Sequence, residues 1–281
     1  MFRARLILCF AMLMFLTPAY ADQAPRRVVS MNLCTDQLAY MIAAPGQLVS
    51  VTYIASDPSA SLIHDKLSNL HINHGLAEEI LRLDPDLVIA GAYTTRTTVH
   101  LLRRLGVQVE EFKPSRNFQD IRNRIVKMGE LLHREKVANN YLEAFDKNLE
   151  AFLKTPSDNA QKPVLGIYSL NSYVAGKGSL ESEMTKAAGF RHMGAEIGLS
   201  GSGRLSLESL ILTNPDQLMT WRRWAMLPNR SADVLRHPAL QRWFSEERRI
   251  FMDQRHWICG TPEVINGIKA LKRAYEGKKN D

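Results

Sequence analysis

Signature motifs of nucleotide-binding proteins and hydrolases are absent from this 281-residue chain. No G-x-G-x-x-G follows the first apolar segment and no G-x-x-x-x-G-K-[ST] occurs, so nucleotide binding is unsupported. The G-x-S-x-G of serine hydrolases is also missing, and the Asp and His residues are dispersed without a triad pattern. These absences argue against catalysis, and a secreted α/β enzyme is kept only as an alternative.

Cysteine is scarce, with three residues in the whole chain and no C-x-x-C spacing, so a zinc or redox motif is not indicated. Cys9 lies in an N-terminal apolar segment, which leaves Cys34 and Cys259. These two form either one disulfide or two buried thiols, because the sequence does not supply the Cα separation that a bridge needs.

Long apolar runs and basic clusters are missing as well. The run from Leu6 to Leu16 is too short to span a membrane, but it follows two arginines and precedes Ala19-Tyr20-Ala21. This pattern predicts a signal peptide, residues 1–21, cleaved after Ala21, and therefore an exported protein. The net charge of +7 is scattered along the chain, so we expect no nucleic-acid partner.

Short apolar segments alternate with helical segments on both sides of the middle of the chain, which predicts parallel α/β sheets. The segment 71–75 (HINHG) is interpreted as a turn. The predicted strands are 26–31, 48–53, 87–91, 107–112, 163–169, 217–221 and 249–252. The predicted helices are 37–42, 76–83, 94–105, 182–188, 206–212, 231–235, 238–244 and 261–275.

A helical block occupies the centre, from Asn117 to Phe152. Asn117 is a good N-cap, apolar residues recur every three or four positions, and a break is expected near residue 133. The second helix, residues 135–154, would span about 30 Å. The predicted fold is α/β, with two Rossmann-like lobes of mostly parallel sheet linked by a single long α-helix. The predicted parts are 22–116 (N-terminal lobe), 117–154 (helical block with the interlobe helix) and 155–281 (C-terminal lobe).

One internal repeat supports this duplicated architecture. A short helix, a Pro-Asp stop and a strand occur in each half, with Glu78 seven residues before Pro85 and Glu208 seven residues before Pro215. Helix–turn–strand units are common, so the repeat by itself is weak support.

Taken in order, these pieces resemble the periplasmic substrate-binding proteins of ABC importers for ferric siderophores, haem and cobalamin. The resemblance is carried by residues 27–32 (RVVSMN), 84–90 (DPDLVIA), 105–107 (LGV), the helical block and the second Pro-Asp unit. It implies a periplasmic monomer without a cofactor, which delivers an iron complex, haem or cobalamin to a permease dimer. It also implies that Glu78 and Glu208 dock on the permease, where the ordinary alternative is two first-turn helix glutamates. Zn- or Mn-binding receptors with the same backbone remain an alternative, although their ordered His and carboxylate ligands are not found and no metal site is predicted.

A ligand is expected beyond the carboxyl ends of the strands, in the cleft between the lobes. Aromatic side chains there would stack on a flat ligand, and arginines would pair with its carboxylates or phosphate. A Tyr or His that ligates haem iron is an alternative. The candidate ligand-binding residues are Asn32, Tyr53, His74, Tyr93, Arg96, Tyr173, Trp221, Arg222, Trp224 and Trp257.

Overall fold

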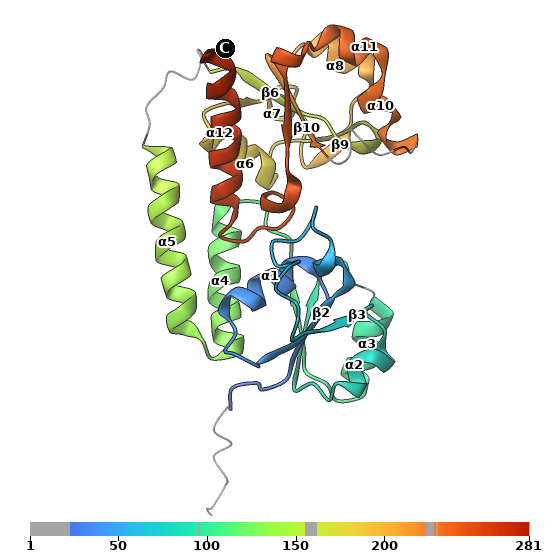
Figure 1. Ribbon diagram of the computed structural model, residues 1–281, viewed down its shortest axis with the longest axis vertical. Helices are drawn as coiled ribbons and strands as arrows, with labels where there is room; N and C mark the ends of the chain where they lie inside the picture. The colour runs from blue at the N-terminus through green and yellow to red at the C-terminus, as the bar shows by residue number, and fades with distance from the viewer. Residues whose placement is uncertain (1–22, 95, 155–161, 223–227, 229, 281) are drawn as a thin grey trace, which may run out of the picture.

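The computed structural model describes residues 23–94, 96–154, 162–222, 228 and 230–280. The predicted signal peptide, residues 1–21, lies outside the described residues. Within the described ranges, no helix combines the length and apolar character needed to cross a membrane. Figure 1 shows two α/β lobes stacked along the long axis, with two helices running along one side of both.

The N-terminal lobe is built on a five-stranded parallel sheet with the order β3-β2-β1-β4-β5. Its strands are β1 (Val28–Ser30), β2 (Leu48–Thr52), β3 (His71–Asn73), β4 (Leu87–Gly91) and β5 (Val109–Phe112). Its helices are α1 (Leu33–Ile42), α2 (Ala77–Arg82) and α3 (Arg96–Arg104). Every residue of β1 and β4 is buried, as expected for central parallel strands covered on both faces. The strand order reverses between β1 and β4.

The prediction of a turn at residues 71–75 is wrong for the first three residues, which form the edge strand β3. The buried Asn73 side chain donates to the Ser30 carbonyl oxygen at 3.0 Å and to Ser50 Oγ at 2.9 Å. These long-range bonds hold β3 against the sheet. They could not be predicted from the sequence, because the residues of this segment are typical of turns.

The C-terminal lobe contains a four-stranded parallel sheet of order β11-β10-β6-β8 and a separate antiparallel pair, β7 with β9. Its strands are β6 (Val164–Ile167), β7 (Tyr173–Ala175), β8 (Arg191–His192), β9 (Ser202–Arg204), β10 (Gln217–Trp221) and β11 (Arg249–Met252). Its helices are α6 (Leu180–Ala187), α7 (Met193–Glu196), α8 (Leu207–Thr213), α10 (Asp233–Arg236), α11 (Pro238–Trp243) and α12 (Val264–Asn280). The short strands β7, β8 and β9 are missing from the sequence prediction.

Two antiparallel helices lie beside the lobes, α4 (Phe118–Leu132) and α5 (Glu135–Leu153). The first packs on α1 of the N-terminal lobe, whereas α5 packs on α4 and also on α6 and α12 of the C-terminal lobe, so α5 is the long helix that links the lobes. The Asn117 side chain caps α4 by accepting from the Asp120 N–H, and α4 ends at His133 in the left-handed conformation, as the predicted break requires. Gly129 lets the helices approach closely, because a Cβ there would lie 2.5 Å from the Ala138 Cβ. The predicted cap, break and long second helix are all present.

One apolar core runs through both lobes and the helical pair. It joins α1 and the N-terminal sheet to α4 and α5, and these to the C-terminal sheet, α6 and α12. Ile125, Phe145 and Leu271 are each less than 3% exposed. Because this core is continuous along one side (Figure 1), the lobes are held at a defined spacing there. The predicted two-lobed α/β fold is confirmed.

Candidate functional site

A cleft of about 670 Å³ lies between the two lobes. Its volume falls within the range of small-molecule binding sites, about 300–1,000 Å³. In the N-terminal lobe it is lined by the segments that follow β1, β4 and β5, and in the C-terminal lobe by residues 177–181, the start of β9 and the segment after β11. Arg124 of α4 completes the lining where the lobes meet the helical pair.

The N-terminal wall is built at the point where the strand order reverses, the usual ligand position in open α/β sheets. The Asn32 side chain follows β1 and caps α1 by accepting from the Cys34 N–H at 3.0 Å. It lies against Gly91 at the end of β4, where a Cβ would approach Asn32 Nδ2 to 2.7 Å. Tyr93, two residues further, is 83% exposed and lines the cleft. Glycine at position 91 therefore lets the α1 cap lie across the strand end.

The C-terminal wall is formed differently, by the end of the antiparallel β7–β9 pair and the start of α6. Lys177 follows β7 and donates its backbone N–H to the Leu199 carbonyl oxygen at 2.7 Å. Ser179 caps α6 by accepting from the Ser182 N–H at 3.1 Å. Trp257 is 3% exposed and packs edge-to-face on Trp221, with ring centroids 5.7 Å apart. The wall thus offers polar groups at the helix start and one supported aromatic ring.

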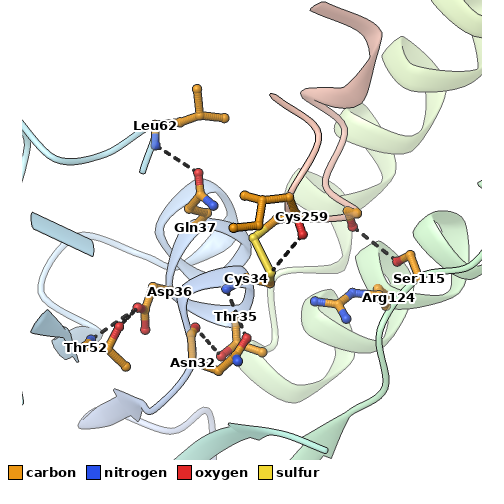
Figure 2. The surroundings of a disulfide bond; sticks show 12 residues. Asn32, Cys34, Thr35, Asp36, Gln37, Thr52, Leu62, Ser115, Arg124 and Cys259 are labelled. Atoms are coloured by element: carbon orange, nitrogen blue, oxygen red, sulfur yellow. Dashed lines mark hydrogen bonds between the residues drawn. A yellow bond between two sulfur atoms is a disulfide. The ribbon is translucent and has the colours of Figure 1, made fainter. Parts of the chain in front are cut away.

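A disulfide between Cys34 and Cys259 joins the lobes beside the cleft (Figure 2), with a Cα–Cα distance of 5.0 Å. Cys34 lies in the first turn of α1, whereas Cys259 lies in the segment between β11 and α12. Next to the bridge, Ser115 Oγ lies 3.4 Å from the Gly260 carbonyl oxygen, which is a second contact across the lobes. The lobes are therefore tied by a covalent link as well as by the helical pair.

The cleft is electropositive. Arg116, Arg124 and Lys177 line it together with a single acid, Glu181. None of the four forms an ion pair with another described residue. Burial lowers the Arg124 pKa to about 10, so this side chain remains cationic at neutral pH. A negatively charged ligand would be attracted to such a surface.

No group of three or more His, Cys, Asp or Glu side chains that could hold a metal ion occurs among the described residues. The His74 Nδ1 lies 3.2 Å from Glu79 Oε1, and its ring stacks on Tyr53 with centroids 5.4 Å apart. No histidine is among the residues that line the cleft in the described part of the chain.

Three of the predicted ligand-binding residues, Asn32, Tyr93 and Trp257, line the cleft. Trp221 lies behind Trp257 and is 6% exposed, so it supports the wall without lining it. Tyr53 and His74 stack on one another outside the lining.

Three further predicted residues, Arg96, Tyr173 and Arg222, lie elsewhere. Arg96 is exposed at the start of α3, and Tyr173 packs against the Arg204 guanidinium at 5.4 Å. Arg222 is exposed, with Nη2 lying 3.4 Å from the Phe251 carbonyl oxygen. Trp224 lies outside the described residues. The antiparallel β7–β9 pair explains the position of Tyr173, because β7 folds back from the end of β6 and the opposite end of the pair, near Ala175 and Ser202, lies at the cleft.

The two predicted docking residues occupy equivalent positions in the two lobes. Glu78 and Glu208 are both exposed in the first turns of α2 and α8, and neither lines the cleft. Hydrogen bonds, first from its own backbone N–H and then from Ser206, lower the pKa of Glu208. Figure 1 places α2 and α8 on the side of the lobes away from α5.

Sequence reasoning missed several lining residues, and two of them carried a usable signal. Arg116 lies just beyond the carboxyl end of β5, a loop to which the same strand-end rule applies. Arg124 lies on the apolar face of α4, between Ile121 and Ile125, and a charge on a buried helix face often marks a site. Lys177 and Ser179 had no comparable signal, because the β7–β9 pair that positions them depends on pairing between distant segments.

Asp36 lies in α1 beside the bridge (Figure 2), and its buried carboxyl group is expected to make the stability of the fold depend on pH. Its Oδ2 accepts from Thr52 Oγ1 at 2.6 Å, while Oδ1 has no hydrogen-bond partner among the described residues, and burial raises its pKa from 3.8 to about 7. The folded protein therefore keeps a proton that the unfolded chain loses between about pH 4 and 7, so this carboxyl destabilises the fold as pH rises through that window. The free energy of unfolding of Asp36→Asn, minus that of the unmodified protein, is expected to increase by about 3 kcal/mol when the pH is raised from 5 to 8.

Urea unfolding at the two pH values measures this gain. Asp65→Asn, at an exposed position, is the matched control and should change little. An equal stability difference for Asp36→Asn at both pH values would contradict the interpretation.

Two parallel-sheet lobes, a helical link along one side and a cleft lined from both lobes define a two-lobed solute-binding protein. The chain belongs to the periplasmic binding protein family, whose model matches residues 28–244. The relatives described below, to which the chain is similar, are binding proteins.

The chain is similar to curated cobalamin-binding proteins. It is 23% identical over 201 residues to the cobalamin-binding protein of Halobacterium salinarum (strain ATCC 29341 / DSM 671 / R1), a match that covers 71% of this chain and 54% of that protein. The chain thus spans about half the length of that relative. It is also 25% identical over 281 residues to the vitamin B12-binding protein of Vibrio parahaemolyticus, with 95% of each chain covered.

Among solved structures, the periplasmic haem-binding protein of Roseiflexus sp. RS-1 in its apo form superposes with a TM-score of 0.73 at 19% identity. This superposition covers 90% of the present chain and 98% of that protein. At this identity, the similarity establishes a shared fold.

Proposed function

We propose that the protein is the periplasmic solute receptor of an ABC importer, and that it captures an iron chelate, haem or a corrinoid in the interlobe cleft and delivers it to the permease. The single observation that carries this proposal is the 670 Å³ cleft, lined from both lobes and bearing Tyr93, Trp257 and three cationic side chains. Aromatic rings stack on flat or macrocyclic ligands, and the cations pair with their acidic substituents.

The composition of the lining favours binding over catalysis. The described lining residues include Ser115, Ser179 and Ser202, but no histidine that could activate them. Cys34 is bridged and therefore offers no thiolate. The relatives named above bind cobalamin or haem, which supports the same class of ligand for this chain.

Ligand titration tests the proposal. Purified protein is titrated with iron protoporphyrin IX, cobalamin and a set of ferric chelates, while tryptophan fluorescence and ligand absorbance are followed. We expect one of these ligands to bind with saturation and to quench the fluorescence, because Trp257 lines the cleft. Failure of every member to bind would contradict the proposal.

Substitution of Trp257 locates the binding site. Trp257→Ala is expected to weaken binding about tenfold through lost stacking and packing, whereas Trp257→Phe should keep most of the affinity because it retains an aromatic ring. Trp243→Phe is the matched control, since Trp243 is 49% exposed on α11 and does not line the cleft. Unchanged affinity in Trp257→Ala would place the ligand elsewhere.

A further inference from the structure

Arg124 is an unusual residue in the wall of the cleft. It is 7% exposed, and its Nη1 donates to the Lys113 carbonyl oxygen. Its guanidinium group also lies over the Phe112 ring, 5.4 Å from the centroid. The remaining donors, Nε and Nη2, are enclosed and have no hydrogen-bond partner among the described residues. A buried cation with two unused donors is costly, because the desolvation of these groups is not compensated.

The surroundings of Arg124 do not provide the missing acceptor. Asp120 is the acid that acts on it electrostatically, but the two side chains form no ion pair within 4 Å. Figure 2 shows the guanidinium group pointing from α4 toward the side on which Cys34 and Asn32 lie, and both of these residues line the cleft. Arg124 already contributes to the cleft surface, so a rotation of its guanidinium group would present the unused donors to a ligand.

Two other cations face the same space and form no ion pair with the residues that the structure describes. Lys177 and Arg116 line the cleft from opposite lobes, and the N-terminus of α6 lies between Lys177 and Glu181. The positive end of a helix dipole adds to the field of these side chains. Glu181 supplies the one negative charge in the described lining. The charges therefore favour an acidic group on the ligand, and the buried donors of Arg124 favour an oxyanion with two acceptor oxygens.

We propose that Arg124 is the anion-recognising residue of the cleft, and that the transported ligand carries a carboxylate or phosphate group that pairs with it. This inference rests on the proposed function and narrows its ligand class. It excludes neutral chelates as the preferred cargo. It also explains why a buried arginine is tolerated on the apolar face of α4, where an aliphatic residue would pack at lower cost.

Matched ligand pairs test the inference because the two members of each pair differ in an acidic group. The pairs are iron protoporphyrin IX with its dimethyl ester, cobalamin with cobinamide, and a ferric trihydroxamate that bears a free carboxylate with its methyl ester. The first pair tests a carboxylate and the second tests the phosphodiester of the nucleotide loop. In the unmodified protein, the acidic member of the pair that binds is expected to bind about 10- to 100-fold more tightly.

Arg124→Met is expected to abolish this preference, whereas Arg124→Lys should keep part of it. The matched control is Arg122→Met, two residues earlier on α4, where the side chain pairs with Asp146 of α5 at 2.7 Å and does not line the cleft. A merely structural role for Arg124 would weaken binding of both members of a pair equally, so the affinity ratio separates the two roles.

Each outcome decides the inference. A ratio near one in the unmodified protein, or a preference that survives in Arg124→Met, overturns the assignment of Arg124 and leaves the receptor function standing. Binding of none of the six ligands overturns both. If Arg124→Met does not fold, the ratio measured on Arg124→Lys and on the unmodified protein still decides between an acidic and a neutral ligand.

Discussion

Replacing both Cys34 and Cys259 by serine is expected to lower the free energy of unfolding by about 2 to 5 kcal/mol. The bridge closes a loop between residues 225 positions apart, so its removal releases a large part of the unfolded chain from constraint. It also removes the covalent tie between α1 and the segment before α12. The remaining links are the helical pair and the contacts around Ser115 and Gly260, and we expect a wider spread of lobe spacings.

Urea unfolding of the double variant measures the stability loss, and small-angle X-ray scattering measures the lobe spacing. The unmodified protein treated with a thiol reductant should approach the variant in both measurements, and the variant itself should not respond to the reductant. Thiol counting on the unfolded, unreduced mature protein provides an independent check. Two free thiols in that experiment would show that the bridge is not formed.

The second large effect is expected in transport. Glu78→Ala combined with Glu208→Ala should reduce uptake by a reconstituted permease at least about tenfold, because the loss of one charge from each lobe removes the pairing that orients the receptor. Ligand affinity should be unchanged, since neither residue lines the cleft. The positions of both residues in the first turns of α2 and α8 give them similar exposure in the two lobes.

The matched control removes the same charge from a different face. Glu130 and Glu143 are exposed on α4 and α5, and their double alanine variant should transport normally. The docking assignment would be contradicted by loss of ligand binding in Glu78→Ala/Glu208→Ala, or by equal transport in the two double variants.

Much of the fold was predictable because its signals are local. The strand 87–91 lies between a Pro-Asp stop and a turn, and the structure has β4 at these residues. The N-cap at Asn117 and the break near His133 are also encoded within a few residues. A three-residue strand such as β3 or β7 has too few side chains to produce a recognisable period, so its existence depends on the partner strand.

The candidate site was predictable only in part, for a related reason. The strand-end rule correctly brings Asn32, Tyr93 and Trp257 to one cleft, because parallel strands place their carboxyl ends at one edge. The rule does not indicate which strand end is covered by another element. Trp221 lies at the carboxyl end of β10, as the rule requires. It nevertheless lies behind Trp257, because the Trp257 ring packs across that strand end.

The order of short strands and helices, the helical centre and the two equivalent glutamates follow from residues that are neighbours in the chain. Two features required the folded molecule: the approach of Cys34 to Cys259, and the exposure of Arg124 to the cleft from a helix face that is otherwise apolar. Local patterns specify which backbone conformation each segment adopts. The distances between segments hundreds of residues apart are decided by how the lobes and the helical pair pack against each other, and that packing sets both the bridge and the charge of the cleft.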